Sequence, residues 1–134
     1  EFTNIIALQN PEIFNANDAS SNKFDERSDD KGMEPEGVTL AQVGDKTLAF
    51  IGLERTGGVM TYDVTDPVAP VFESYTPATD GDAAPEGLLF IAASDNGTNK
   101  NLLLVSHEDT GTIAVYALGE SDLIFKAGFE LVSD

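Results

Sequence analysis

Apolar residues from Gly37 onward fall into short runs that are separated by turn residues at regular intervals. The first four runs cover 37–43, 47–54, 59–64 and 71–75, and the next four cover 87–92, 101–106, 112–118 and 123–129. Short apolar or alternating runs bounded by Gly, Pro, Asn and Asp predict β-strands. Because no amphipathic stretch is long enough for a substantial helix, the pattern predicts an all-β fold.

The two sets of runs repeat one another. Pro35-Glu36-Gly37 recurs as Pro85-Glu86-Gly87, and Glu54 recurs as Glu108. The offset is 86 − 36 = 50 residues at the first motif and 108 − 54 = 54 at the second, with the extra residues in the loop 94–101. A repeat of about 50 residues made of strands and turns is typical of propeller blades. We therefore predict two four-stranded antiparallel β-propeller-type blades, 38–82 and 83–134, packed face to face.

Residues 1–37 lack this pattern and are predicted to be an N-terminal segment with a long acidic loop. Residues 5–8 fit either a short strand or a turn of helix. From 15 to 32 the chain is rich in Asn, Asp, Ser and Lys, which favour turns because their side chains bond to nearby backbone. Loops of this length in compact domains are usually functional or disordered.

Two blades cannot close a ring, since propellers use about four to eight. A pair would leave two apolar sheet faces uncovered. We therefore expect the chain to be a fragment of a longer protein whose remaining blades cover those faces, or to associate with copies of itself.

The strong excess of acidic residues limits the classes of molecule that the protein can bind. Asp and Glu number 24 against 7 Lys and Arg, which gives a net charge of −17. Such a surface repels nucleic acid and anionic lipid, and it suits divalent cations, basic partners or a saline environment. No apolar run approaches the roughly 20 residues that span a bilayer, so no membrane insertion is expected. The absence of cysteine excludes disulfides and thiolate chemistry.

Several motifs resemble the last third of a family of bacterial exported proteins, the choice-of-anchor I proteins. They lie at 10–15, 24–37, 49–55, 60–67 and 85–91. The resemblance covers most of the chain. It implies C-terminal blades of a seven-bladed-propeller-like ectodomain that is periplasmic, at the cell surface or secreted. Relatives are often labelled alkaline phosphatase-like, so the resemblance indicates a fold and a location better than an activity.

Four glutamates form the first candidate site: Glu36, Glu54, Glu86 and Glu108. The start of a blade's first strand lies beside the end of its second, and the first strand of a propeller blade lines the axis. We therefore expect these carboxylates to converge near the axis, where calcium, with six to eight oxygen ligands, would neutralise their repulsion. Alternatively, each carboxylate accepts backbone N–H bonds, and Arg55 supplies the counter-charge.

The acidic loop is the second candidate site. Its acidic residues are Asp25, Glu26, Asp29, Asp30 and Glu34, and their composition resembles that of a calcium loop. The metal-ligating candidates among them are Asp25, Asp29 and Asp30. The spacing does not match an EF-hand, and Arg27 and Lys31 could instead pair with the loop carboxylates.

The third candidate is His107, the only histidine. A histidine beside carboxylates can act as a general base, but Leu53 occupies the equivalent place in the first repeat, which favours packing or hydrogen bonding. The usual hydrolase and nucleotide-binding motifs are absent. The sequence thus predicts a structural or binding ectodomain stabilised by calcium. The alternative is a metal-dependent ester or phosphoester hydrolase, alkaline phosphatase-like, phytase-like or lactonase-like, so the question of enzymatic activity stays open.

Overall fold

The computed structural model describes residues 2–79, 82–119 and 124–126. One α-helix, α1 (Phe2–Gln9), and three 3-10 turns, η1 (Pro11–Ile13), η2 (Ser21–Lys23) and η3 (Ala93–Asp95), accompany the strands. The strands are β1 (Pro35–Val43), β2 (Lys46–Leu53), β3 (Val59–Asp63), β4 (Val71–Thr76), β5 (Pro85–Ile91), β6 (Leu102–His107), β7 (Thr112–Leu118) and β8 (Ile124–Lys126). The all-β prediction is confirmed. Apart from β8, the predicted strand 123–129 lies outside the described residues.

The strands form two four-stranded antiparallel sheets with the orders β1-β2-β3-β4 and β5-β6-β7-β8. Their registers repeat as well as their sequences. Pro35 lies opposite Leu53 in the first sheet, and Pro85 lies opposite His107 in the second. In both sheets the register shifts just after this first pair, so the sequence repeat is also a structural repeat. The extra residues of the second repeat form the connection between β5 and β6, which contains η3.

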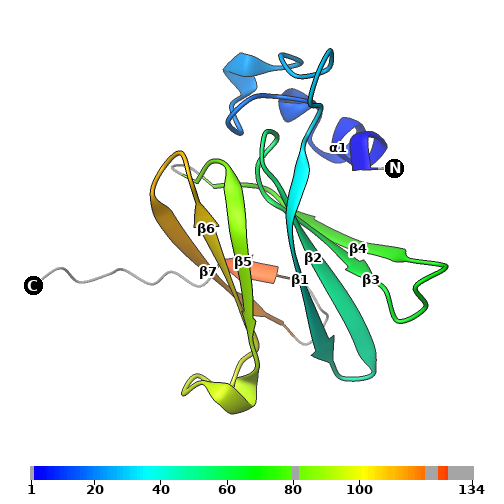
Figure 1. The fold of residues 1–134 in the computed structure, drawn as a ribbon, viewed down its shortest axis with the longest axis vertical. Coiled ribbons are helices and arrows are strands. Elements are labelled where there is room, and N and C mark those ends of the chain that lie inside the picture. Colours follow the sequence, from blue (N-terminus) through cyan, green and yellow to red (C-terminus); the bar gives the residue numbers. More distant parts are fainter. Residues whose placement is uncertain (1, 80–81, 120–123, 127–134) are drawn as a thin grey trace, which may run out of the picture.

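The two sheets pack face to face and diverge outward (Figure 1). Strands β1 and β5 lie side by side, while β3 and β4 extend to one side and β7 to the other. A single cluster of buried side chains fills the space between the sheets; its members include Leu48, Phe50, Leu103, Val105 and Tyr116. The wedge between the sheets is therefore the main hydrophobic core.

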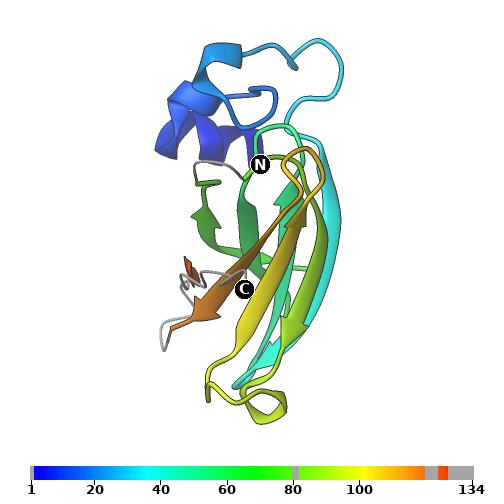
Figure 2. The same cartoon turned by 90° about the vertical axis from the view of Figure 1, so that its left-hand side faces the viewer.

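The N-terminal segment covers part of the opposite face of the first sheet. Helix α1 places Phe2, Ile5 and Ile6 on one face through their helical spacing, and Ile6 is fully buried in a cluster with Met60 and Tyr62. The rings of Phe2 and Tyr62 lie 5.2 Å apart. Of the two alternatives considered for residues 5–8, a short strand or a turn of helix, the structure has the helical one. The segment projects beyond one end of the sheets (Figure 2).

Candidate functional site

Two backbone hydrogen bonds build a corner where the N-terminal segment enters the first sheet. Glu34 has a positive φ of 52°, and its carbonyl accepts the Glu54 N–H at 2.9 Å. One residue further along, the Arg55 N–H donates to the Met33 carbonyl at 3.2 Å. These bonds continue the hydrogen bonding of the β1–β2 hairpin past Pro35 and Leu53, the pair at its open end. Consequently, the chain entering β1 and the chain leaving β2 present their side chains together.

Three carboxylates meet at this corner. One oxygen from each of Glu34, Glu36 and Glu54 lies within 4.8 Å of the other two. Glu36 is exposed, whereas the Glu54 side chain is only 12% exposed. Arg55 spans two of the carboxylates, with Nε 2.8 Å from Glu34 Oε2 and Nη2 2.7 Å from Glu54 Oε1. Lys31 also pairs with Glu34. The corner is thus a compact carboxylate group that is partly neutralised by two cations.

The proton affinities of these carboxylates differ. The pKa of Glu54 is raised from 4.5 to about 7, first because its carboxyl shares a hydrogen bond with Glu36 and second because it is removed from water. Arg55 opposes that rise. The pKa of Glu34 is lowered, with the hydrogen bond from Lys31 as the main cause. The Glu54 carboxyl therefore gains or loses its proton near neutral pH.

The second sheet has an equivalent corner with different side chains. Ala84 has a φ of 57° and its carbonyl accepts the Glu108 N–H at 2.9 Å, so the backbone repeats that of Glu34 and Glu54. However, alanine replaces Glu34, and Asp109 replaces Arg55. Within the described part of the chain, the one group of three metal-ligating side chains is that at the first corner, and it excludes Glu86 and Glu108.

The structure thus brings Glu36 and Glu54 together and adds Glu34, which the sequence pattern assigned to the loop. Only the left-handed turn before Pro35 turns that residue toward the other two. The one feature of the sequence that could have identified Glu34 is its position immediately before the repeated Pro-Glu-Gly motif.

The loop aspartates lie apart from this corner and make local contacts. Asp25 accepts a hydrogen bond from the Ser28 hydroxyl. Asp30 accepts one from the Lys31 N–H and lies 3.3 Å from Arg27 Nη1. Asp29 is exposed. These three residues do not belong to the three-carboxylate group, so calcium binding by the loop remains a prediction.

His107 lies inside the second corner rather than on a surface. Its side chain is 1% exposed, and Nδ1 lies 3.3 Å from Thr112 Oγ1 and 3.8 Å from Asp82 Oδ1. The Asp82 carboxylate accepts hydrogen bonds from Thr112 at 3.0 Å and from Thr79 at 2.9 Å. Such burial favours the hydrogen-bonding role over that of a general base, because a general base must reach its substrate.

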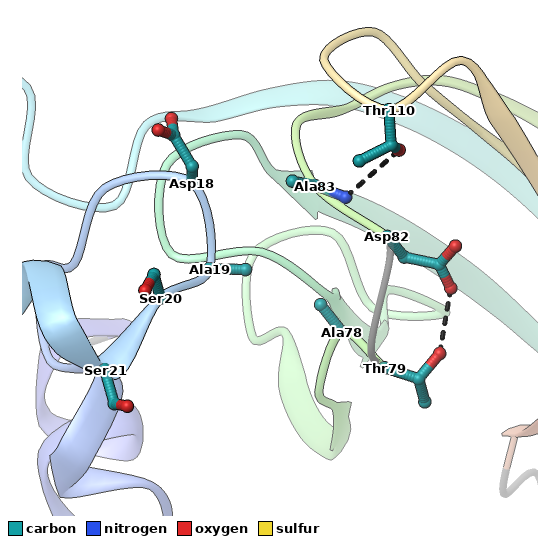
Figure 3. A pocket seen from close by; sticks show the side chains of 9 residues that line it. All are labelled: Asp18, Ala19, Ser20, Ser21, Ala78, Thr79, Asp82, Ala83 and Thr110. Atoms are coloured by element: carbon teal, nitrogen blue, oxygen red, sulfur yellow. Dashed lines mark hydrogen bonds between the residues drawn. The ribbon is translucent and has the colours of Figure 1, made fainter.

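A polar hollow of about 410 Å³ adjoins this network. It lies between the N-terminal segment, the connection from β4 to β5, and the turn from β6 to β7 (Figure 3). The side chains of Asp18 and Asp82 point in different directions there, and Asp82 is turned toward Thr79. Among the described residues that line the hollow, the acidic side chains of Asp18 and Asp82 do not converge on one point.

Comparisons with known proteins place the chain in a family. The choice-of-anchor I domain matches residues 1–67, which include all three carboxylates of the first corner. The chain is also 32% identical over 130 residues to Gigasin-3a of Magallana gigas. That match covers 82% of this chain and 46% of Gigasin-3a, so the chain spans about half the length of this curated relative. No solved structure matches. None of the helices in the described ranges is long and apolar enough to cross a membrane. On this evidence, the chain belongs to the choice-of-anchor I domain family.

Proposed function

We propose that this chain forms two consecutive propeller-type blades, 38–82 and 83–134, of an ectodomain with a structural or binding role. Choice-of-anchor domains belong to cell-surface or exported proteins, and we extend this to a periplasmic, surface-bound or secreted location. The observation that carries the propeller proposal is the side-by-side position of β1 and β5, from which the two sheets diverge (Figure 1). Blades arranged around an axis have this relation, with their first strands innermost.

We further propose that the first corner binds calcium through Glu34, Glu36 and Glu54. Oxygen atoms that bind one Ca²⁺ at 2.3–2.6 Å lie no more than about 5 Å apart, and the 4.8 Å limit on these three fits that requirement. Arg55 and Lys31 neutralise two of the three carboxylates. The remaining negative charge can be neutralised either by a proton on Glu54 or by a bound metal cation. Because the corner joins the N-terminal segment to both β1 and β2, the ion would stabilise this junction.

The repeat supplies matched controls for the calcium proposal. We expect calcium to raise the melting temperature of the native chain, because a ligand that binds only the folded form stabilises it. Glu36→Gln and Glu54→Gln should abolish that rise. Glu86→Gln and Glu108→Gln change the equivalent glutamates at the second corner, where the described residues form no group of three carboxylates, and they should preserve the rise. The site would be refuted if neither calcium nor chelator changed the melting temperature of the native chain. It would also be refuted if all four variants lost the calcium-dependent rise equally.

One observation favours a second candidate, the metal-dependent ester or phosphoester hydrolase. The three carboxylate oxygens within 4.8 Å of one another fit a bound cation that would polarise an ester or activate a water molecule. Hydrolysis of an aryl phosphate or an aryl ester by the calcium-loaded chain would support this candidate if Glu54→Gln abolished it and Glu108→Gln did not. Equal rates for the native chain and Glu54→Gln would reject it.

A further inference from the structure

The outward face of the second sheet carries an apolar hollow around Gly87. The hollow measures about 240 Å³ and is lined by Gly87, Leu88, Leu89, Leu104, Ser106 and Ile113. Across the strands, Gly87 pairs with Ser106 and Ser106 with Ile113. Two residues further along, Leu89 pairs with Leu104 and Leu104 with Val115. Leu89 is 56% exposed and Ile113 is 65% exposed, so large apolar side chains border an open depression.

The equivalent place on the first sheet is occupied. The register makes Gly37 and Gly52 the counterparts of Gly87 and Ser106. A Cβ added at Gly37 would lie 2.6 Å from Leu88 Cδ1, and one added at Gly52 would lie 3.2 Å from it. The two glycines therefore make the space in which the second sheet inserts Leu88 against the first. The Gly87 hollow is the same feature one repeat later, and no side chain of the described residues is inserted into it.

The first sheet has an exposed residue at the position equivalent to Leu88. The repeated register makes Val38, opposite Ile51, equivalent to Leu88, opposite Val105. Val38 is 62% exposed, and Leu40 on the same face of β1 is 61% exposed. Helix α1 packs over the part of this face that belongs to β2, β3 and β4. It leaves Val38 and Leu40 accessible at the innermost strand, where the two sheets of the chain approach most closely.

We propose that copies of this chain associate head to tail, with Val38 of one copy inserted into the Gly87 hollow of the next. The contact would repeat the packing of Leu88 against Gly37 and Gly52 inside each copy. Because the two surfaces differ, the interface is heterologous, and assembly gives a ring if the rotation between copies closes and an open filament if it does not. The proposal depends on the blade packing and not on calcium, so its test is independent of the cation site. Net charge −17 opposes association, and salt screens that repulsion.

Sedimentation velocity at high salt and rising protein concentration tests this proposal. We expect the native chain to associate, and we expect Val38→Asp and Ile113→Asp each to remain monomeric. Mixing those two variants should restore dimers but nothing larger, since each variant retains one intact surface. Val71→Asp, which changes a 57% exposed valine on β4, is the matched control and should associate like the native chain. Unchanged melting temperatures would exclude misfolding, because all three sites are exposed.

The complementation experiment separates the possible outcomes. A native chain that stays monomeric at every concentration would overturn the proposal and leave the hollow to a further blade of a longer polypeptide. A mixture of Val38→Asp and Ile113→Asp that stays monomeric would also overturn it, since the head-to-tail geometry requires rescue. Because the chain has no cysteine, a mixture of Val38→Cys and Ser106→Cys offers a second test. It should form an intermolecular disulfide between unlike variants faster than either variant does alone.

Discussion

Glu34 and Ala84 occupy the same left-handed position at the entry to their sheets, but only Glu34 supplies a carboxylate. Their φ angles are 52° and 57°, and each carbonyl accepts a backbone N–H at 2.9 Å from the glutamate that follows the second strand of its sheet. The backbone of the corner is therefore independent of its side chains. At the second corner alanine takes the place of Glu34 and Asp109 takes the place of Arg55, and the described residues there form no group of three carboxylates.

The first prediction concerns the pH dependence of stability in the absence of calcium. The pKa of Glu54 is about 7 in the folded chain against an ordinary 4.5, so between these values the folded state binds more protons than the unfolded state. Its contribution to the free energy of unfolding is complete below pH 4.5 and is lost as the pH rises through about 7. The amide of Glu54→Gln can still donate a hydrogen bond to Glu36 but does not titrate. As the pH rises over this range, the free energy of unfolding of this variant should therefore fall by about 1–3 kcal/mol less than that of the native chain. Urea unfolding of both proteins with chelator measures the difference, and identical profiles would contradict it.

The second prediction transfers the corner to the second sheet. Ala84→Glu places a third carboxylate beside Glu86 and Glu108 on a backbone that already accepts glutamate at the equivalent position. Ala84 is 1% exposed, so without calcium both the burial of the new carboxylate and its repulsion should destabilise the chain, by about 1–3 kcal/mol at neutral pH. With calcium, titration calorimetry should detect one more binding site than in the native chain. Ala83→Glu, one residue away, is the control, and an unchanged number of sites in Ala84→Glu would count against carboxylate grouping as the basis of binding.

The third prediction tests the close approach of the two sheets. A Cβ at Gly37 would lie 2.3 Å from the Glu86 carbonyl oxygen, and backbone cannot move aside as a flexible side chain can. We expect Gly37→Ala to lower the free energy of unfolding by at least about 2–3 kcal/mol. Gly97→Ala is the control, because a Cβ there meets nothing within 4 Å, and it should change stability by less than about 0.5 kcal/mol. Similar losses in the two variants would show that Gly37 is not needed for sheet packing.

The fourth prediction addresses the His107 network. His107→Leu imitates Leu53 of the first repeat but leaves the Asp82 carboxylate, whose side chain is 6% exposed, beside an apolar group. It should therefore cost about 1–3 kcal/mol of stability. Asp82→Ala in the same chain should restore part of that loss, so the double variant loses less than the sum of the single variants. Additive losses in chemical denaturation would indicate that the two residues act separately.

The sequence by itself determined the repeated architecture. Alternation of apolar and polar residues sets which side of a strand is buried, and Gly and Pro mark where strands end. The positions of seven strands, the insertion between β5 and β6 and the pairing of Glu36 with Glu54 all follow from that local information. The helical spacing of Phe2, Ile5 and Ile6 was too short to distinguish α1 from a strand, because its helical conformation depends on burial against the first sheet.

Only the tertiary structure decided which side chains share a site. The four repeated glutamates were predicted to converge, yet the group that forms within the described chain takes two of them and adds Glu34. A left-handed turn aims Glu34 at Glu54, and the direction of a turn is not encoded in the spacing of acidic residues. Likewise, the sequence presents Leu53 as an apolar residue and His107 as a candidate base at equivalent positions. The structure buries both side chains, so His107 is in a position to form hydrogen bonds rather than to meet a substrate. Local pattern specifies strands because it depends on neighbours along the chain, whereas a site depends on contacts between segments that are brought together only by folding.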